Sequence, residues 1–174
     1  MTQYSKRMVI IHWLTLALLL VAWYLGDTLS DATDESRATL SGYIVHGLVG
    51  IAIILLTVTR LFFRSVDGTP PAIGQTRMDK FAKGVHHLLY LSLFVLPLSG
   101  ILTIVKSSAG KALLAGDATM LPKAHGYHGL LVHSVHSNMV TVLIVLVVVH
   151  LLGALKHQFI LKDALLERMM LRRK

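Results

Sequence analysis

Histidine is the residue type in this sequence with the greatest capacity for chemistry. The 174-residue chain contains ten histidines and no cysteine, and several of the histidines lie inside long apolar runs rather than in loops. A neutral imidazole binds metal ions through a ring nitrogen and exchanges a proton near neutral pH. The absence of cysteine excludes disulfides, thiolate-bound iron–sulfur clusters, thioether-linked haem and cysteine nucleophiles. Any metal chemistry therefore depends on histidine, carboxylate or methionine.

The elements that must position these histidines are four apolar stretches. Hydrophobic residues make up 54% of the chain and charged residues 15%, a composition that argues against a soluble domain. A helix needs about 20 apolar residues to cross about 30 Å of hydrocarbon, and runs such as 140–149 are too continuously apolar for a membrane β-barrel. We predict an all-α fold, an integral membrane four-helix bundle forming a single domain over residues 1–174. The predicted helices cover about residues 8–25, 40–63, 86–105 and 133–155.

Lysine and arginine are distributed unequally between the two sides of this bundle. Of the 17 basic residues, 13 fall on the side of the two termini and 4 on the other. The positive-inside rule then places both termini in the cytoplasm, and we expect a multi-pass protein of the bacterial inner membrane. The first outer loop is acidic, whereas the second is basic and could steer a small anion. The loop residues concerned are Asp27, Asp31, Asp34 and Glu35 in the first, and Lys106, Lys111 and Lys123 in the second.

The expected depth of each intramembrane histidine determines which of them could meet. The first helix runs outwards and the second inwards, so His12 lies near the inner side and His46 near the outer side. On the fourth helix His136 comes early and His150 late, about 14 residues or ~21 Å further on, and this spacing places both on one face. His12 therefore matches His150 in depth, and His46 matches His136.

Two imidazoles that face each other at one depth are what a bis-histidine haem b requires, because the iron takes one neutral nitrogen on each side. We expect two non-covalent haem b groups. The inner iron would be bound by His12 and His150, and the outer iron by His46 and His136. Small residues beside the candidates would admit a flat porphyrin, or would serve ordinary helix packing. They are Gly42, Gly47, Gly50 and Gly100.

The remaining histidines suggest two further sites. His86 and His87 are expected to open the third helix at the inner surface, level with His12 and His150. There His86 could exchange a proton with a quinone head group, as could His157 at the end of the fourth helix, although histidines at this depth also anchor helix ends. A zinc or copper site is an alternative for four residues at helical spacing, but no carboxylate or thiolate completes it. These four residues are His125, His128, His133 and His136.

A series of short motifs follows one another along nearly the whole chain. They are Tyr4-Ser5, His12-Trp13, His46, Arg60-Leu61, Arg64, Thr69-Pro70-Pro71, His86, Leu96-Pro97, Gly100, the His136–His150 spacing, His157, and Leu166 before Arg168-Met169-Met170. In their order and spacing the sequence resembles the prokaryotic cytochrome b561 family of small dihaem inner-membrane proteins. The resemblance implies the ligand pairs His12–His150 and His46–His136 and electron transfer with ubiquinone. In one branch it also implies oxidation of superoxide at the outer surface.

The predicted function is an oxidoreductase activity that passes single electrons between an outer donor, with superoxide as one candidate, and the ubiquinone pool. An alternative is a haem-containing membrane anchor and electron conduit for a separate dehydrogenase or hydrogenase subunit, which would be its redox partner protein. A third hypothesis is a haem-free, colourless metal or proton transporter. Membrane lipid is an expected partner of the basic tail 172–174. Nucleic acid is not, because the basic residues form no aromatic-interleaved patch.

Overall fold

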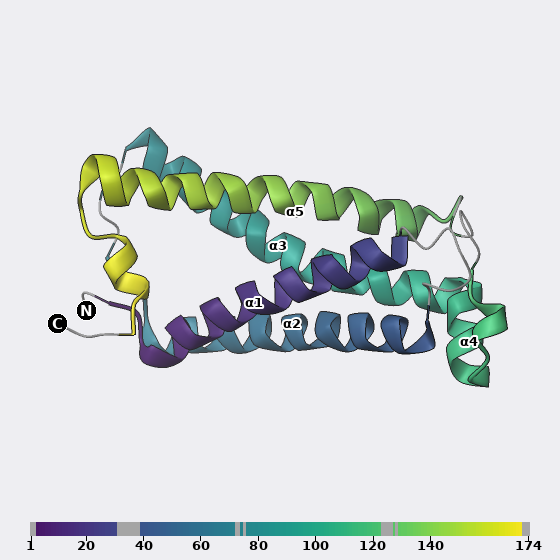
Figure 1. Ribbon diagram of the computed structural model, residues 1–174. Coiled ribbons are helices and arrows are strands. Elements are labelled where there is room, and N and C mark those ends of the chain that lie inside the picture. The colour runs from purple at the N-terminus through teal and green to yellow at the C-terminus, as the bar shows by residue number, and fades with distance from the viewer. Residues whose placement is uncertain are drawn as a thin grey trace.

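Four long helices run side by side in the computed structural model of the protein (Figure 1). They are α1 (Lys6–Ser30), α2 (Leu40–Asp67), α3 (Arg77–Lys106) and α5 (Leu131–Lys156), and all four are long and apolar enough to cross a membrane. Many of their large apolar side chains are exposed, as expected of surfaces that face lipid. The predicted fold class, an all-α membrane four-helix bundle, is confirmed.

The structure describes residues 3–30, 39–71, 74, 76–122, 127 and 129–171. Several residues of the sequence analysis lie outside the described residues. They are Asp31, Asp34 and Glu35 of the first outer loop, Lys123, His125 and His128 of the second, and the basic tail 172–174.

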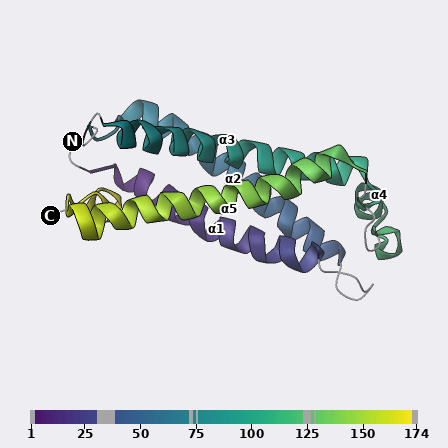
Figure 2. The same cartoon turned by 90° about the horizontal axis from the view of Figure 1, so that it is seen from above.

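The helices alternate in direction, so the bundle has two distinct ends. We call the end formed by the starts of α1 and α3 and the ends of α2 and α5 the termini end, because both chain termini lie there (Figure 1). The opposite end carries the short helix α4 (Ser108–Ala115) and is called the α4 end (Figure 2). Within the bundle, α1 packs along α2 and α3 along α5, while the contact between α2 and α3 joins the two pairs.

The third helix begins nine residues earlier than predicted, and this changes the position of two histidines. Thr76 accepts a hydrogen bond from Asp79 N, and the Asp79 carboxylate accepts one from Thr76 N, which forms a capping box at the start of α3. His86 and His87 therefore do not open this helix but lie more than two turns inside it. Hydropathy misses the first two turns because they carry lysines and an aspartate, whereas the cap stabilises them as helix.

Helix α4 and the short segments around it cover the α4 end, where the sequence analysis expected only a loop. Ser107 caps the start of α4, and Gly116 ends it with a positive φ of 67°. Tyr43 of α2 packs in a buried cluster with Ala109, Ala112 and Leu121. The Tyr127 hydroxyl donates to the Tyr43 hydroxyl at 2.9 Å, and burial raises the pKa of Tyr127 far above its usual range, so this donor keeps its proton. Two short 3₁₀ helices, η1 (Ala118–Met120) and η3 (Leu166–Met169), were also not predicted.

The C-terminal segment folds back over the termini end. After the π-helix η2 (His157–Leu161) the chain turns through Lys162 and Ala164, both with positive φ. Met169 O then accepts a hydrogen bond from Trp13 Nε1 at 3.0 Å, and the Arg168 side chain donates to Pro71 O at 2.7 Å. This segment therefore connects the start of α1 with the loop after α2.

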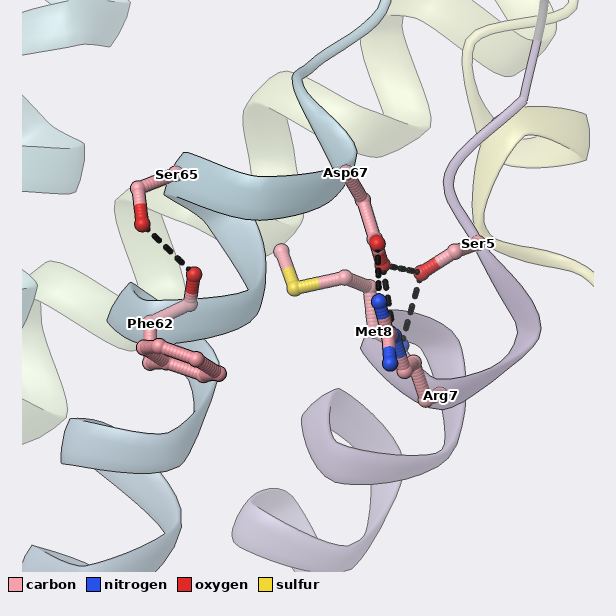
Figure 3. A network of polar contacts seen from close by, with 6 residues as sticks. All are labelled: Ser5, Arg7, Met8, Phe62, Ser65 and Asp67. Carbon is pink, nitrogen blue, oxygen red and sulfur yellow. Dashed lines mark hydrogen bonds and ion pairs between the residues drawn. The ribbon is translucent and has the colours of Figure 1, made fainter.

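An ion pair joins the start of α1 to the last residue of α2 (Figure 3). The Arg7 guanidinium donates to both oxygens of the Asp67 carboxylate, and Ser5 Oγ donates to the same carboxylate at 2.5 Å. The Arg7 guanidinium also lies 4.0 Å above the centre of the Phe63 ring, in a cation–π contact. Gly68, with φ 73°, ends α2 immediately after this contact.

We expect Asp67→Asn to lower the thermal midpoint of the detergent-solubilised protein, because Arg7 then loses its carboxylate partner. The Arg7 side chain is about half exposed, so salt should screen the pair and reduce the difference from wild type. Ser65→Ala is the control, since Ser65 Oγ donates to the Phe62 carbonyl of its own helix and to no other helix among the described residues. Equal midpoints for wild type and Asp67→Asn at low salt would show that the pair does not stabilise the bundle.

Candidate functional site

Two pairs of histidines face each other between helices, one near each end of the bundle. The rings of His12 on α1 and His150 on α5 have their centres 6.2 Å apart, at the termini end. The rings of His46 on α2 and His136 on α5 also lie 6.2 Å apart, at the α4 end. In both pairs the ring planes are steeply inclined, by 68° and 79°. The structure thus brings together the pairs expected from helix depth.

The separation of the rings fits a metal ion bound between them. An iron held in a straight line by two imidazole nitrogens at about 2.0 Å each would place the ring centres about 6.3 Å apart. Both pairs lie within 0.1 Å of this spacing. The ring of His86 lies only 5.1 Å from that of His150, which is too close for the same arrangement. The spacing therefore favours His12 over His86 as the partner of His150.

His136 is held by the backbone of α3. Its Nδ1 donates to Leu96 O at 2.8 Å, and Ser99 Oγ lies 3.2 Å from the same nitrogen. A proton fixed on Nδ1 leaves Nε2 with a free lone pair, which is the form of histidine that binds a metal. A β-carbon added at Gly100 would lie 3.0 Å from Cε1 of this ring. A larger residue at this position would press on the ring and force it to shift by a few tenths of an ångström.

His46 has a similar glycine neighbour, which the sequence analysis missed. A β-carbon at Gly26 of α1 would lie 3.2 Å from His46 Cε1. His46 Nδ1 is buried and has no hydrogen bond of normal geometry with a described residue, but the backbone of Ala22 on α1 interacts with this ring as a hydrogen-bond partner. The glycine is visible in the sequence, but its approach to His46 depends on how α1 crosses α2.

The glycines that the sequence analysis singled out differ in their surroundings. Gly100 contacts a paired histidine, whereas a β-carbon at Gly50 would contact Pro97 and one at Gly42 would contact Leu29. No atom lies within 4 Å of a β-carbon built at Gly47. Gly42 and Gly50 therefore serve the packing of helices, the alternative that their sequence context left open.

The His12–His150 pair belongs to a wider polar layer, which we define as His12, Arg60, His86 and His150. Each of these four residues comes from a different long helix. His86 is an exposed residue whose Nδ1 lies 2.7 Å from Ala82 O in its own helix. Arg60 Nε donates to the hydroxyl of Tyr90 at 3.1 Å. The layer combines imidazoles with one cation inside the membrane-spanning part of the chain.

His157 lies further towards the termini end and is bound to a carboxylate. Its Nδ1 is 2.5 Å from Asp163 Oδ2, and Asp163 Oδ1 accepts a hydrogen bond from Leu165 N at 3.2 Å. Asp163 cannot be recognised from the sequence as a partner of His157, because this contact depends on the turn through Lys162 and Ala164. A histidine held by a carboxylate in this way presents its other nitrogen in a fixed direction.

The alternative metal site in the second outer loop receives no support from the residues that the structure describes. His133 stacks on Tyr127, with ring centres 4.7 Å apart, while His136 faces His46. No cluster of three or more potential metal ligands occurs among the described residues. The other two members, His125 and His128, lie outside the part of the chain that is described.

Comparison with known proteins gives the family. The model of the prokaryotic cytochrome b561 family matches residues 3–171. Cytochrome b562 of Cereibacter sphaeroides is 32% identical over 96% of this chain and 94% of its own length. The probable superoxide oxidase CybB of Yersinia pestis is 30% identical over 97% of this chain and 96% of its own length. Cytochrome b561 homolog 1 of Escherichia coli is 27% identical over the whole of both chains. No solved structure matches the chain.

The family match covers all four long helices and all the paired histidines. It agrees with the resemblance drawn from the sequence motifs, and it carries with it haem b and electron transfer in a membrane. The chain belongs to the prokaryotic cytochrome b561 family of membrane electron-transfer proteins.

Proposed function

We propose that the protein is a dihaem b cytochrome that moves single electrons across the membrane, between a donor at the α4 end and ubiquinone at the termini end. The observation that carries this proposal is the presence of two histidine pairs with the same ring spacing of 6.2 Å. Both pairs use one face of α5, about 14 residues or ~21 Å apart along that helix. With a haem at each of these positions, an electron could cross the membrane in several transfers, each over a distance shorter than the membrane thickness.

His12 and His150 would bind the inner haem, and His46 and His136 the outer haem. Each haem iron would gain and lose one electron while both imidazoles remain bound. The contacts of His136 with Leu96 and Gly100 fix the orientation of one outer ligand, which limits the rearrangement that accompanies a change of charge.

Ubiquinone would bind beside the inner pair. His86 is exposed on α3 with its ring 5.1 Å from that of His150, so a lipid-soluble molecule could reach it from the bilayer. Reduction of a quinone to a quinol takes up two electrons and two protons. His86 and the carboxylate-bound His157 are the groups at this end that could supply those protons.

The distribution of charge supports an orientation with the termini end in the cytoplasm of a bacterial inner membrane. The described lysines and arginines at the ends of the long helices lie mainly at the termini end, and Lys106 and Lys111 lie at the α4 end. The donor would then react on the outer side. The name of the Yersinia pestis relative makes superoxide the first donor to test, and Lys106 and Lys111 at the α4 end suit a small anion.

The ligand pairs predict which haem each histidine holds. His150→Ala should reduce haem from about two per chain to about one, because the outer pair stays intact. His136→Ala should also lose one haem, with a different spectrum for the haem that remains. Pyridine-haemochrome quantitation and reduced-minus-oxidised spectra of the purified protein measure both. Two haems in His150→Ala would refute the pairing, and a colourless wild-type protein would refute the proposed function.

The glycine beside His136 predicts a steric effect on the outer haem alone. Gly100→Val should displace the His136 ring, whose Cε1 would lie 3.0 Å from the new β-carbon, and should lower haem content towards one per chain. Gly84→Val is the matched control, since Gly84 lies on the same helix as Gly100, is exposed, and its β-carbon meets no atom within 4 Å. The same haem content and potentials in Gly100→Val as in wild type would contradict the role of Gly100.

The proton-transfer role predicts variants that keep haem but react slowly with quinone. His86→Gln or His157→Gln should slow the reoxidation of reduced haem by ubiquinone by about 10²-fold, the usual contribution of a general acid. Asp163→Asn should slow it less, because an amide oxygen still accepts a hydrogen bond from His157. His87→Gln, the exposed neighbour of His86, is the control. Stopped-flow absorbance measures these rates, and unchanged rates in both histidine variants would exclude this quinone site.

A further inference from the structure

Arg60 carries a positive charge inside the membrane-spanning part of α2. It lies seven residues before the end of the helix at Asp67, or roughly 10 Å along the axis. A charged side chain at such a depth is costly and is normally paired with an opposite charge or lines a functional site. The Arg60 guanidinium therefore requires a partner whose interaction offsets the free energy of removing the charge from water.

The described residues give Arg60 a neutral partner and no ionic one. Its Nε donates to the Tyr90 hydroxyl at 3.1 Å, and no ion pair joins it to a carboxylate of the described chain. Asp67, the acidic residue near the end of the same helix, is bound by Arg7 and Ser5. One bond to a phenol uses one of the five N–H donors of a guanidinium. The bond also orients the planar group, whose terminal nitrogens suit a carboxylate.

The electrostatic neighbours of Arg60 place its charge at the inner histidine pair. The Arg60 guanidinium acts electrostatically on His12, His86 and His150, the other members of the polar layer, whereas Arg64 acts on His86 but not on His12 or His150. No arginine or lysine acts in this way on His46 or His136. Within the described structure, the two histidine pairs therefore differ in that the positive charge of Arg60 acts on the inner pair and no such charge acts on the outer pair.

We propose that Arg60, oriented by Tyr90, binds a carboxylate of the haem held between His12 and His150 and raises the reduction potential of that haem. Haem b carries two propionate carboxylates, and a guanidinium binds a carboxylate through two parallel hydrogen bonds. A positive charge close to the haem favours the reduced iron, and it does so more strongly where water is excluded. This proposal rests on the proposed function, since it requires a haem at the inner pair.

The test is a spectroelectrochemical titration of the full-length, haem-loaded protein. The inner haem is identified as the redox step that is missing in His150→Ala. Arg60→Gln should lower the reduction equilibrium constant of that step about tenfold, equivalent to ~59 mV for a one-electron couple, and leave the other step unchanged. Arg60→Lys should retain most of the wild-type potential because it keeps the charge. Tyr90→Phe should give a smaller decrease of the same sign, because the guanidinium is then less well oriented.

Arg64→Gln is the matched control, because it removes the same charge one turn further along α2 from an exposed residue. Solvent screens that charge, so its effect on the inner haem should be smaller. A shift in Arg60→Gln no larger than in Arg64→Gln would overturn the proposal. Unchanged potentials with a raised KM for ubiquinone would also overturn it, since Arg60 would then bind the quinone oxygen.

Two further results keep this test separate from that of the proposed function. If Arg60→Gln does not assemble with haem, the volume-conserving Tyr90→Phe and the charge-conserving Arg60→Lys still report the potential. Wild-type potentials in Tyr90→Phe together with a lowered potential in Arg60→Lys would overturn the orienting role of Tyr90. A wild-type protein without haem at the inner pair would refute the proposed function itself.

Discussion

Imidazole groups inside an apolar bundle need partners that the surrounding lipid cannot supply, and this requirement governs how the helices are arranged. α5 carries one paired histidine near each end of its apolar stretch, and α1 and α2 each carry its partner at the matching depth. One histidine of α1 and one of α2 therefore face α5 at two different levels. A shift of α5 by one turn, about 5.4 Å, would separate both pairs at once.

Close approach of the helices makes this register possible. α1 packs on α2 and α3 on α5, and the histidines face one another between these two packed pairs. Buried hydroxyls such as those of Thr57 and Ser92 bond carbonyls of their own helices, so they add no unsatisfied polar group to the interior. Gly26 and Gly100 leave room for the rings of the outer pair. These small residues therefore let the rings of His46 and His136 pack directly on neighbouring helices.

The two histidine pairs differ in what surrounds them. The outer pair is held by uncharged groups, chiefly a backbone carbonyl of α3 and two glycines. The inner pair lies in a layer with a cation and a further histidine, and below it the His157–Asp163 contact and the returning C-terminal segment occupy the termini end. An inner site with titratable groups suits a reaction that also moves protons.

The sequence by itself determined the four spans, their alternation and the histidine pairs, because apolar length and residue spacing along a helix are local properties. It did not predict the start of α3 at Arg77 or the presence of α4, since a capping box and a short capped helix leave little trace in hydropathy. Only the tertiary structure decided that Gly26 touches His46, that Tyr90 holds Arg60 and that Asp163 binds His157. These contacts depend on the crossing of helices and on one turn after α5, which the spacing of residues along a single helix does not specify.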